Sequence, residues 1–336
     1  GARGAAGAAG AACAAPAAAG GGGAPNTAGG GGVGAAGGAT PPASPAPPAG
    51  AGGTPTAGGP PLVALPTTAG TGAEISSVAV FSVPDRPVKA GLSHPLVGAD
   101  AAVLDPVLTR SLPPDLTAAT AMDALGHAIE TYTTLRYDAL ARPADPADRP
   151  GYAGRTGFGA ACSRRAIELV AGAVRRAVHN GDDLDARAAL LEGAALSSVA
   201  GLTAGAGLCH AMAYPVGARY DAHHGATVAA LTPASTLGHV AGADPGRIAD
   251  LAPAFGVAET GDDRAVADRV REAHVRLQRD LGVLPSGLAD LGVEPADLDE
   301  LARLTVETGE RLLACSPHPA DADEIRAVYE DALHNW

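Results

Sequence analysis

The pattern of apolar and polar positions divides the chain into three stretches of different character. Residues 1–60 show no helical or strand periodicity, because Ala, Gly, Pro, Ser and Thr make up nearly all of them. Residues 61–113 hold short apolar runs bounded by Pro, Gly and Asp, which is typical of strands and turns. Residues 114–336 place apolar residues three or four positions apart, which predicts helices.

The order of these elements predicts an α/β region followed by an all-helical domain. Asp115, which follows two prolines, is expected to begin a helix that ends near Thr133. Short strands are expected at 61–65, 77–83, 88–92 and 101–104. Further helices are expected at 158–179, 183–214, 225–240, 262–281, 295–314 and 320–333.

Composition and charge narrow the class of protein. A length of 336 residues allows two domains, and a net charge of -13 without a basic run argues against nucleic acid or an anionic membrane as partner. No apolar stretch of about 18 residues is free of polar residues, so a membrane span is not expected. The start of the chain is too rich in Gly and Pro for a signal peptide, and the scattered cysteines are typical of reduced thiols. We therefore expect a soluble cytoplasmic enzyme.

Four polar residues in the helical stretch could together hold a metal ion. Asp123 and His127 are spaced i and i+4, so both project from one helix face, although such a pair alone is most often a surface contact. His210 alone is more typical of a hydrogen-bonded core histidine, and His224 before a glycine also has a capping interpretation. Together, one carboxylate and three imidazoles suit Fe(II) or Zn(II). With an open position, such a metal acts as a Lewis acid on an alcohol or carbonyl oxygen.

Several motifs, in order and spacing, resemble the iron-dependent (group III) alcohol dehydrogenases. They are LPTTAGTGAE at 65–74, DPVLTRSLPP at 105–114, AMDALGHAIETY at 121–132 and GLCHAMAYPVGARYDAHHG at 207–225. The resemblance covers roughly residues 61–335. It implies a dehydroquinate synthase-like fold, in which a dinucleotide-binding α/β domain precedes an all-helical metal-binding catalytic domain. It also implies hydride transfer between an alcohol or hydroxy acid and NAD(H).

The resemblance further implies roles for individual residues. The metal ligands would be Asp123, His127, His210 and His224, while His223 occupies a usual proline position and is a neighbour of the site. The Thr-rich turn would contact the nicotinamide cofactor through Thr67, Thr68, Gly70, Thr71, Ser76 and Val78. Lys89 is the only lysine in the chain, either by chance or because a compact ammonium is needed there. The family usually carries a lysine near the cofactor ribose at this position, where it would position the nicotinamide and supply positive charge.

Several segments resemble one branch of the family, the hydroxyacid-oxoacid transhydrogenases. They are CHAMAYP around Tyr214, ETYTTLRY at 130–137, RPGY at 149–152, AVHNGDDLDAR at 177–187 and the C-terminal 315–333. This branch implies hydride transfer from a hydroxy acid such as 4-hydroxybutyrate to an oxo acid such as 2-oxoglutarate. Tyr214 would hydrogen-bond the substrate, relay its proton or pack against the cofactor. Candidate cations for the anionic substrate are Arg136, Arg155 and Arg219.

Two features leave the activity open. The link from Tyr214 to His224 is short, as in ordinary iron-dependent alcohol dehydrogenases acting on small alcohols. The family's Gly-Gly-Gly-Ser-x-x-Asp loop for the pyrophosphate has its nearest counterpart at 29–35, where Gly30 and Gly31 remain but the Ser and Asp are replaced.

Residues 1–60 are therefore either a disordered linker or an eroded domain. The chain would be a fragment, the product of a mistranslated GC-rich gene, or a protein that lacks a complete cofactor domain. We expect three parts: 1–60, the remainder of the α/β domain at 61–113, and the metal-binding domain at 114–336. An inactive metal-binding fragment is the alternative to an enzyme, and a homodimer is an expectation by analogy.

Overall fold

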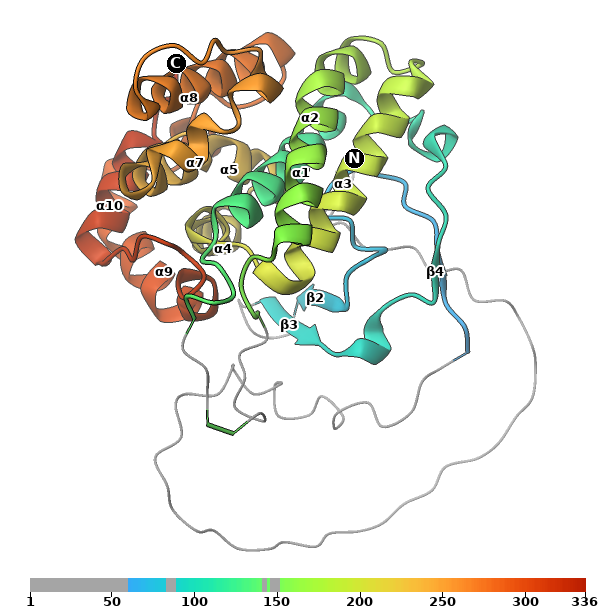
Figure 1. Cartoon of the computed structure of the whole chain (residues 1–336), viewed down its shortest axis with the longest axis horizontal. Coiled ribbons are helices and arrows are strands. Elements are labelled where there is room, and N and C mark those ends of the chain that lie inside the picture. The colour runs from blue at the N-terminus through green and yellow to red at the C-terminus, as the bar shows by residue number, and fades with distance from the viewer. Residues whose placement is uncertain (1–59, 83–88, 141–143, 146–151) are drawn as a thin grey trace, which may run out of the picture.

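The computed structural model describes residues 60–82, 89–140, 144–145 and 152–336. In these residues a small strand region lies beside a much larger set of helices (Figure 1). The glycines of the expected pyrophosphate loop, Gly30 and Gly31, lie outside the described residues.

The strands form two separate two-stranded sheets. β1 (Val63–Ala64) pairs in parallel with β4 (Ala101–Ala102), and β2 (Val78–Ser82) pairs antiparallel with β3 (Lys89–Ser93). The four predicted strands are confirmed, although three are shorter than expected. Val63 in β1 is 49% exposed, whereas parallel strands are normally covered on both faces. Within the described residues, the layer around β1 and β4 is therefore incomplete.

Helix α1 (Pro114–Thr133) is the centre of the helical region and packs against α2 (Gly157–His179), α3 (Leu184–Ala204) and α5 (His224–Leu231). Its proline at the first position and Asp115 in the first turn suit a helix start, as predicted. Most of its residues are buried, all round its circumference. Polar side chains on such a helix must find partners inside the protein.

A sharp break separates α3 from α4 (Leu208–Tyr220), so the prediction of one continuous helix over 183–214 is wrong. Gly205 has a φ of +71°, a conformation that favours glycine, and a Cβ there would lie 2.6 Å from the ring of Tyr152. The two helices meet at 105°. No single helix of the described residues is long and apolar enough to cross a membrane, and α3 and α4 meet that requirement only as this bent pair.

A second core lies between α4, α5 and the two C-terminal helices, whereas the helix before those two packs on the core around α1 and α2. The predicted helix over 225–240 is α5 followed by a π-helix, Ser235–Val240. The other predicted helices are confirmed with small shifts at their ends: α8 (Asp263–Leu281), α9 (Leu298–Leu313) and α10 (Ala322–Asp331). The short helices α6 (Ala241–Ala243) and α7 (Pro245–Ala249) precede α8. Short 3-10 turns lie before α1 at Pro95–Val97 and Pro106–Thr109, and in the C-terminal part at Ala252–Phe255, Leu288–Leu291 and Pro295–Asp297.

Candidate metal centre

Three helices bring the predicted metal ligands together. Asp123 and His127 lie in α1, His210 lies in α4, and His224 is the first residue of α5. The contact between α5 and α1 depends on Gly225, because a Cβ on it would lie 2.2 Å from the backbone oxygen of Ala119. The absence of a side chain at this position therefore lets His224 approach Asp123.

Asp123, His210 and His224 form a compact group, called the Asp-His cluster below. Their candidate ligand atoms all lie within 4.8 Å of one another. Oδ1 of Asp123 lies 3.5 Å from Nε2 of His210 and 3.6 Å from Nε2 of His224. Tetrahedral ligands about 2.1 Å from a metal are separated by about 3.4 Å, so this spacing fits an ion such as Fe(II) or Zn(II).

The burial of the Asp-His cluster also favours a cation. Oδ1 of Asp123 and Nε2 of His210 are buried without a hydrogen-bond partner. Buried polar atoms without partners are costly, and a metal ion between them would satisfy both. The side chain of His224 is 34% exposed, so the cluster opens toward solvent on that side.

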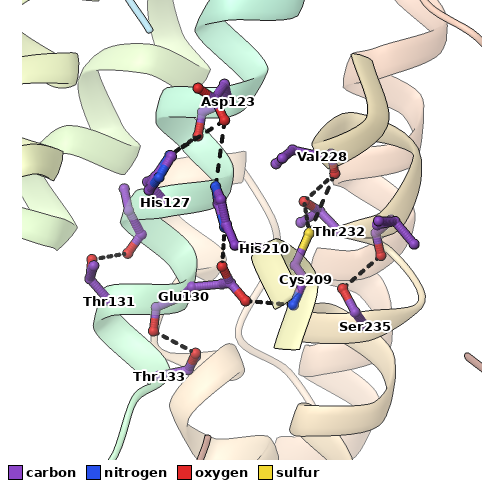
Figure 2. Close-up of polar contacts among 12 residues, drawn as sticks. Asp123, His127, Glu130, Thr131, Thr133, Cys209, His210, Val228, Thr232 and Ser235 are labelled. Carbon is purple, nitrogen blue, oxygen red and sulfur yellow. Dashed lines mark hydrogen bonds and ion pairs between the residues drawn. The ribbon is translucent and has the colours of Figure 1, made fainter. Parts of the chain in front are cut away.

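His127 lies beside the cluster and outside this group of atoms. Its ring centroid is 3.7 Å from that of His210, and its Nδ1 donates a hydrogen bond of 3.0 Å to the backbone oxygen of Asp123 (Figure 2). Because a carbonyl oxygen only accepts, this bond leaves Nε2 of His127 with the free lone pair. The assignment of His127 as fourth ligand stays a prediction.

Glu130 is a buried contact of His210 that the sequence analysis did not single out. It is only 2% exposed, and Figure 2 shows His210 between Asp123 and Glu130. One oxygen of Glu130 accepts a hydrogen bond from Nδ1 of His210, and Oε1 accepts the backbone N–H of Cys209 at 2.7 Å. This contact holds a proton on Nδ1, so the nitrogen that remains for a metal is Nε2, which faces Asp123. The i, i+4, i+7 spacing of Asp123, His127 and Glu130 places them on one helix face and could have revealed this role.

The electrostatics of these groups favour a positive ion. Burial opposes the charged form of Asp123, but His127 and His224 outweigh it and hold its pKa well below the usual value. Burial opposes the charge of Glu130 in the same way, and His210 nevertheless lowers its pKa. For His210 the effect of burial is outweighed by both carboxylates, which raise its pKa to about 9. Two buried carboxylates therefore surround His210, and a metal that binds its Nε2 would displace a proton.

Comparison with known proteins identifies the family. Residues 154–333 match the profile of the Fe-containing alcohol dehydrogenase family, C-terminal, and residues 2–106 match that of iron-containing alcohol dehydrogenase. The chain belongs to the iron-containing alcohol dehydrogenase family. Members of this family are oxidoreductases, and the family and fold class predicted from the motifs are confirmed.

Relatives in this family carry different names. Long-chain-alcohol dehydrogenase 1 of Geobacillus thermodenitrificans is 35% identical over 82% of this chain and 64% of its own length. The mitochondrial hydroxyacid-oxoacid transhydrogenase of Homo sapiens is 31% identical over 81% of this chain and 61% of its own. The chain thus spans less than two thirds of the length of these relatives.

Solved structures of alcohol dehydrogenases share the fold. A 1,3-propanediol oxidoreductase superposes with a TM-score of 0.72 at 32% identity, covering 83% of this chain and 68% of its own. An alcohol dehydrogenase from Oenococcus oeni superposes with a TM-score of 0.74 at 30% identity, covering 83% of this chain and 67% of its own.

In this chain, Tyr214 lies next to the Asp-His cluster. It follows His210 by one helical turn, and its ring stacks on that of His224 with centroids 6.1 Å apart. Although 42% of the residue is exposed, desolvation of its hydroxyl raises the pKa of Tyr214, and the hydroxyl is neutral near pH 7. His223 is the N-cap of α5, and it lies outside the cluster.

The predicted cofactor residues lie in the turn between β1 and β2. The turn packs on α1, since a Cβ on Gly70 would lie 3.3 Å from Cβ of Thr120. It also packs on α3, since a Cβ on Gly72 would lie 2.5 Å from the backbone oxygen of Ala194. Among the residues predicted to contact the cofactor, Thr67 and Thr71 are exposed and Thr68 is partly buried. The side-chain oxygen of Ser76 accepts a hydrogen bond of 3.0 Å from the backbone N–H of Val78. Lys89 is the first residue of β3, and its side chain lies outside the described part of the chain.

Proposed function

We propose that this chain is a metal-dependent oxidoreductase that transfers hydride from a hydroxy acid to an oxo acid through NAD(H), a hydroxyacid-oxoacid transhydrogenase. The observation that supports it is the pair of unsatisfied buried atoms, Oδ1 of Asp123 and Nε2 of His210, which face Nε2 of His224. These residues, with His127, would hold Fe(II) or Zn(II). A bound metal of this kind supplies a Lewis acid that stabilises an alkoxide.

The residues of the chain provide the remaining parts of this chemistry. Glu130 orients His210, and the packing of α1, α4 and α5 excludes water from Asp123. The substrate enters on the side of His224, where the cluster is exposed. Tyr214 on that side has a neutral hydroxyl, which can hydrogen-bond the substrate oxygen, or relay the alcohol proton by passing its own proton on to water.

For the cofactor, we propose that residues 1–113 correspond to the nicotinamide-binding domain and residues 114–336 to the metal-binding domain. The family match over residues 2–106 favours a degraded domain over an unrelated linker for residues 1–60. Lys89 and the Thr67–Thr71 turn would contact the nicotinamide half, and Gly30 and Gly31 the pyrophosphate. The homodimer and the cytoplasmic location stay predictions.

A second candidate is an ordinary iron-dependent alcohol dehydrogenase that acts on small alcohols. The 35% identity to a long-chain-alcohol dehydrogenase and the short link from Tyr214 to His224 favour it. The segment CHAMAYP around Tyr214 favours the transhydrogenase, and among the segments that resemble this branch it lies closest to the Asp-His cluster. A third candidate, a metal-binding fragment without turnover, follows from the replaced residues in the glycine loop at 29–35.

Elemental and cofactor analysis of the purified full chain, followed by turnover assays, tests these candidates. We expect about one Fe or Zn per chain, binding of NAD, and production of 2-hydroxyglutarate from 4-hydroxybutyrate and 2-oxoglutarate. His224→Ala should lose both metal and turnover, whereas the matched His223→Ala should keep both. Oxidation of 1-butanol without reaction of hydroxy acids would favour the alcohol dehydrogenase. Metal without any NAD binding would favour the fragment.

A further inference from the structure

4-Hydroxybutyrate has a carboxylate at the end away from its reacting hydroxyl, and the proposed function requires a cation for this group near the Asp-His cluster. The arginines predicted from sequence have other partners in the structure. Arg136 pairs with Asp138 at 2.6 Å, and Arg219 pairs with both Asp297 and Glu300.

Arg155, the third predicted arginine, is buried and has a neutral partner. Its Nε donates a hydrogen bond of 3.2 Å to the backbone oxygen of Thr134. Burial lowers its pKa, and the neighbouring positive charge of Arg247 lowers it further. Arg155 therefore lacks the exposure that an incoming carboxylate requires.

Arg311 in α9 meets the requirement better. Its guanidinium lies 4.9 Å from the centroid of the Tyr152 ring, and it is exposed to solvent. Among the described residues it forms no ion pair, whereas the other arginine of α9, Arg303, pairs with Glu307. A guanidinium stacked on an aromatic ring keeps its N–H groups free at the edge, where they can bind a carboxylate in a bidentate manner.

Packing between α9 and α4 brings this arginine to the end of α4 that carries His210. A Cβ on Gly309 would lie 2.9 Å from Cβ of Ala211, the residue after His210, so the two helices approach closely there. Tyr152 is held at the same end, because its ring fills the space beside Gly205 in the break before α4. The guanidinium and its aromatic support thus lie at the N-terminal end of α4.

Tyr214 connects this end of α4 to the open side of the cluster. It follows His210 by one turn of α4, and its ring stacks on that of His224 with centroids 6.1 Å apart. Tyr152 and Arg311 both lie close enough to act electrostatically on its hydroxyl. We propose that Arg311, stacked on Tyr152, binds the carboxylate of a hydroxy acid or oxo acid whose oxygen lies at the Asp-His cluster. The site would then select acids over neutral alcohols of the same length. This inference rests on the proposed function for the position of the substrate.

Calorimetric binding to the metal-loaded full chain tests this subsite without requiring turnover. The probes are 4-hydroxybutyrate and 1-butanol, which share a four-carbon chain and a hydroxyl and differ in the carboxylate. Wild-type protein should bind the acid more tightly. Arg311→Gln should weaken binding of the acid about 10-fold or more, as expected for loss of a charge-assisted hydrogen bond, and leave butanol unchanged. Arg311→Lys should lie between the two because it keeps the charge without the planar fork.

Arg303→Gln is the matched control, since it removes an exposed arginine from the same helix, and it should bind both probes as wild type does. Equal binding of 4-hydroxybutyrate by Arg311→Gln and wild type would overturn the proposal. Failure of the wild type to prefer the acid would overturn it too. If only the proposed function is wrong, the outcome differs: the acid still binds through Arg311, but no hydride is transferred to 2-oxoglutarate.

Discussion

Replacement of Glu130 by Gln provides a sharp test of how the metal centre is organised. Glu130 accepts two hydrogen bonds, from the N–H of Cys209 and from Nδ1 of His210. A glutamine has one accepting oxygen and one donating amide. If its oxygen stays on the N–H of Cys209, its NH2 group donates to Nδ1 of His210 and forces the imidazole proton onto Nε2. That nitrogen then presents a hydrogen to Asp123 where a metal needs a lone pair.

The expected loss of metal affinity follows from this change of tautomer. Loss of a hydrogen-bonding partner of a metal-binding histidine typically costs 10- to 100-fold in affinity, or about 1.4–2.7 kcal/mol. Glu130→Gln should therefore bind Fe(II) or Zn(II) about 10- to 100-fold more weakly while the fold is kept. Glu130→Ala should also leave the N–H of Cys209 without a partner, which should cost about 1–3 kcal/mol of folding stability.

Chelator competition at fixed pH measures the metal affinity, and urea denaturation of the metal-free proteins measures the stability. Glu168→Gln is the control, because Glu168 is an exposed residue of α2 that contacts Arg165 at 3.4 Å. It should change neither quantity measurably. Wild-type metal affinity in Glu130→Gln would refute the reasoning, since Glu130 would then only fill space next to His210.

Two further predictions concern packing and pH. Gly225→Ala should destabilise the fold by about 1–3 kcal/mol in urea and weaken metal binding, because its Cβ would meet the backbone of Ala119. Gly172→Ala in α2, where a Cβ meets nothing within 4 Å, should be neutral or stabilising. His274 is fully buried, and burial lowers its pKa to about 3. Between about pH 6.5 and pH 3 the imidazole of His274 binds a proton in the unfolded chain but not in the folded one. The free energy of unfolding should therefore fall by about 2 kcal/mol from pH 8 to pH 5 because of this residue. His274→Leu should lack this part of the pH dependence. If the free energy of unfolding of the variant still fell between pH 8 and pH 5 by as much as that of the wild type, the prediction would be contradicted.

Sequence reasoning could predict most of the helices because their signals are local. The start of α1 is an example: Pro114 and Asp115 suit the first turn of a helix whatever packs around it. The break at residues 205–207 was missed because its cause is not local. Gly205 adopts its positive φ where the ring of Tyr152 occupies the space of a side chain, and Tyr152 is distant in sequence.

The same distinction applies to the site. Spacing in one helix could predict that Asp123 and His127 share a face, but not that His210 and His224 join Asp123 from two other helices. Only the family resemblance supplied that expectation. Periodicity alone also could not identify an arginine that binds the substrate, because the arginines differ only in the residues that contact them in the fold. Arg136 forms an ion pair with Asp138, whereas Arg311 lies over the ring of Tyr152.

The packing of the helices suggests that metal binding and hydride transfer are separable properties of this chain. Asp123 lies on a helix whose buried faces are covered by α2, α3 and α5, and the other members of the Asp-His cluster come from α4 and α5. The strand region contributes none of these ligand atoms, and Val63 in it is half exposed. Loss of order in the strand region would therefore remove the proposed cofactor contacts around Thr67–Thr71 without removing a candidate ligand. A protein that retains its metal is for this reason no evidence of a functional dehydrogenase, and NAD binding must be measured independently.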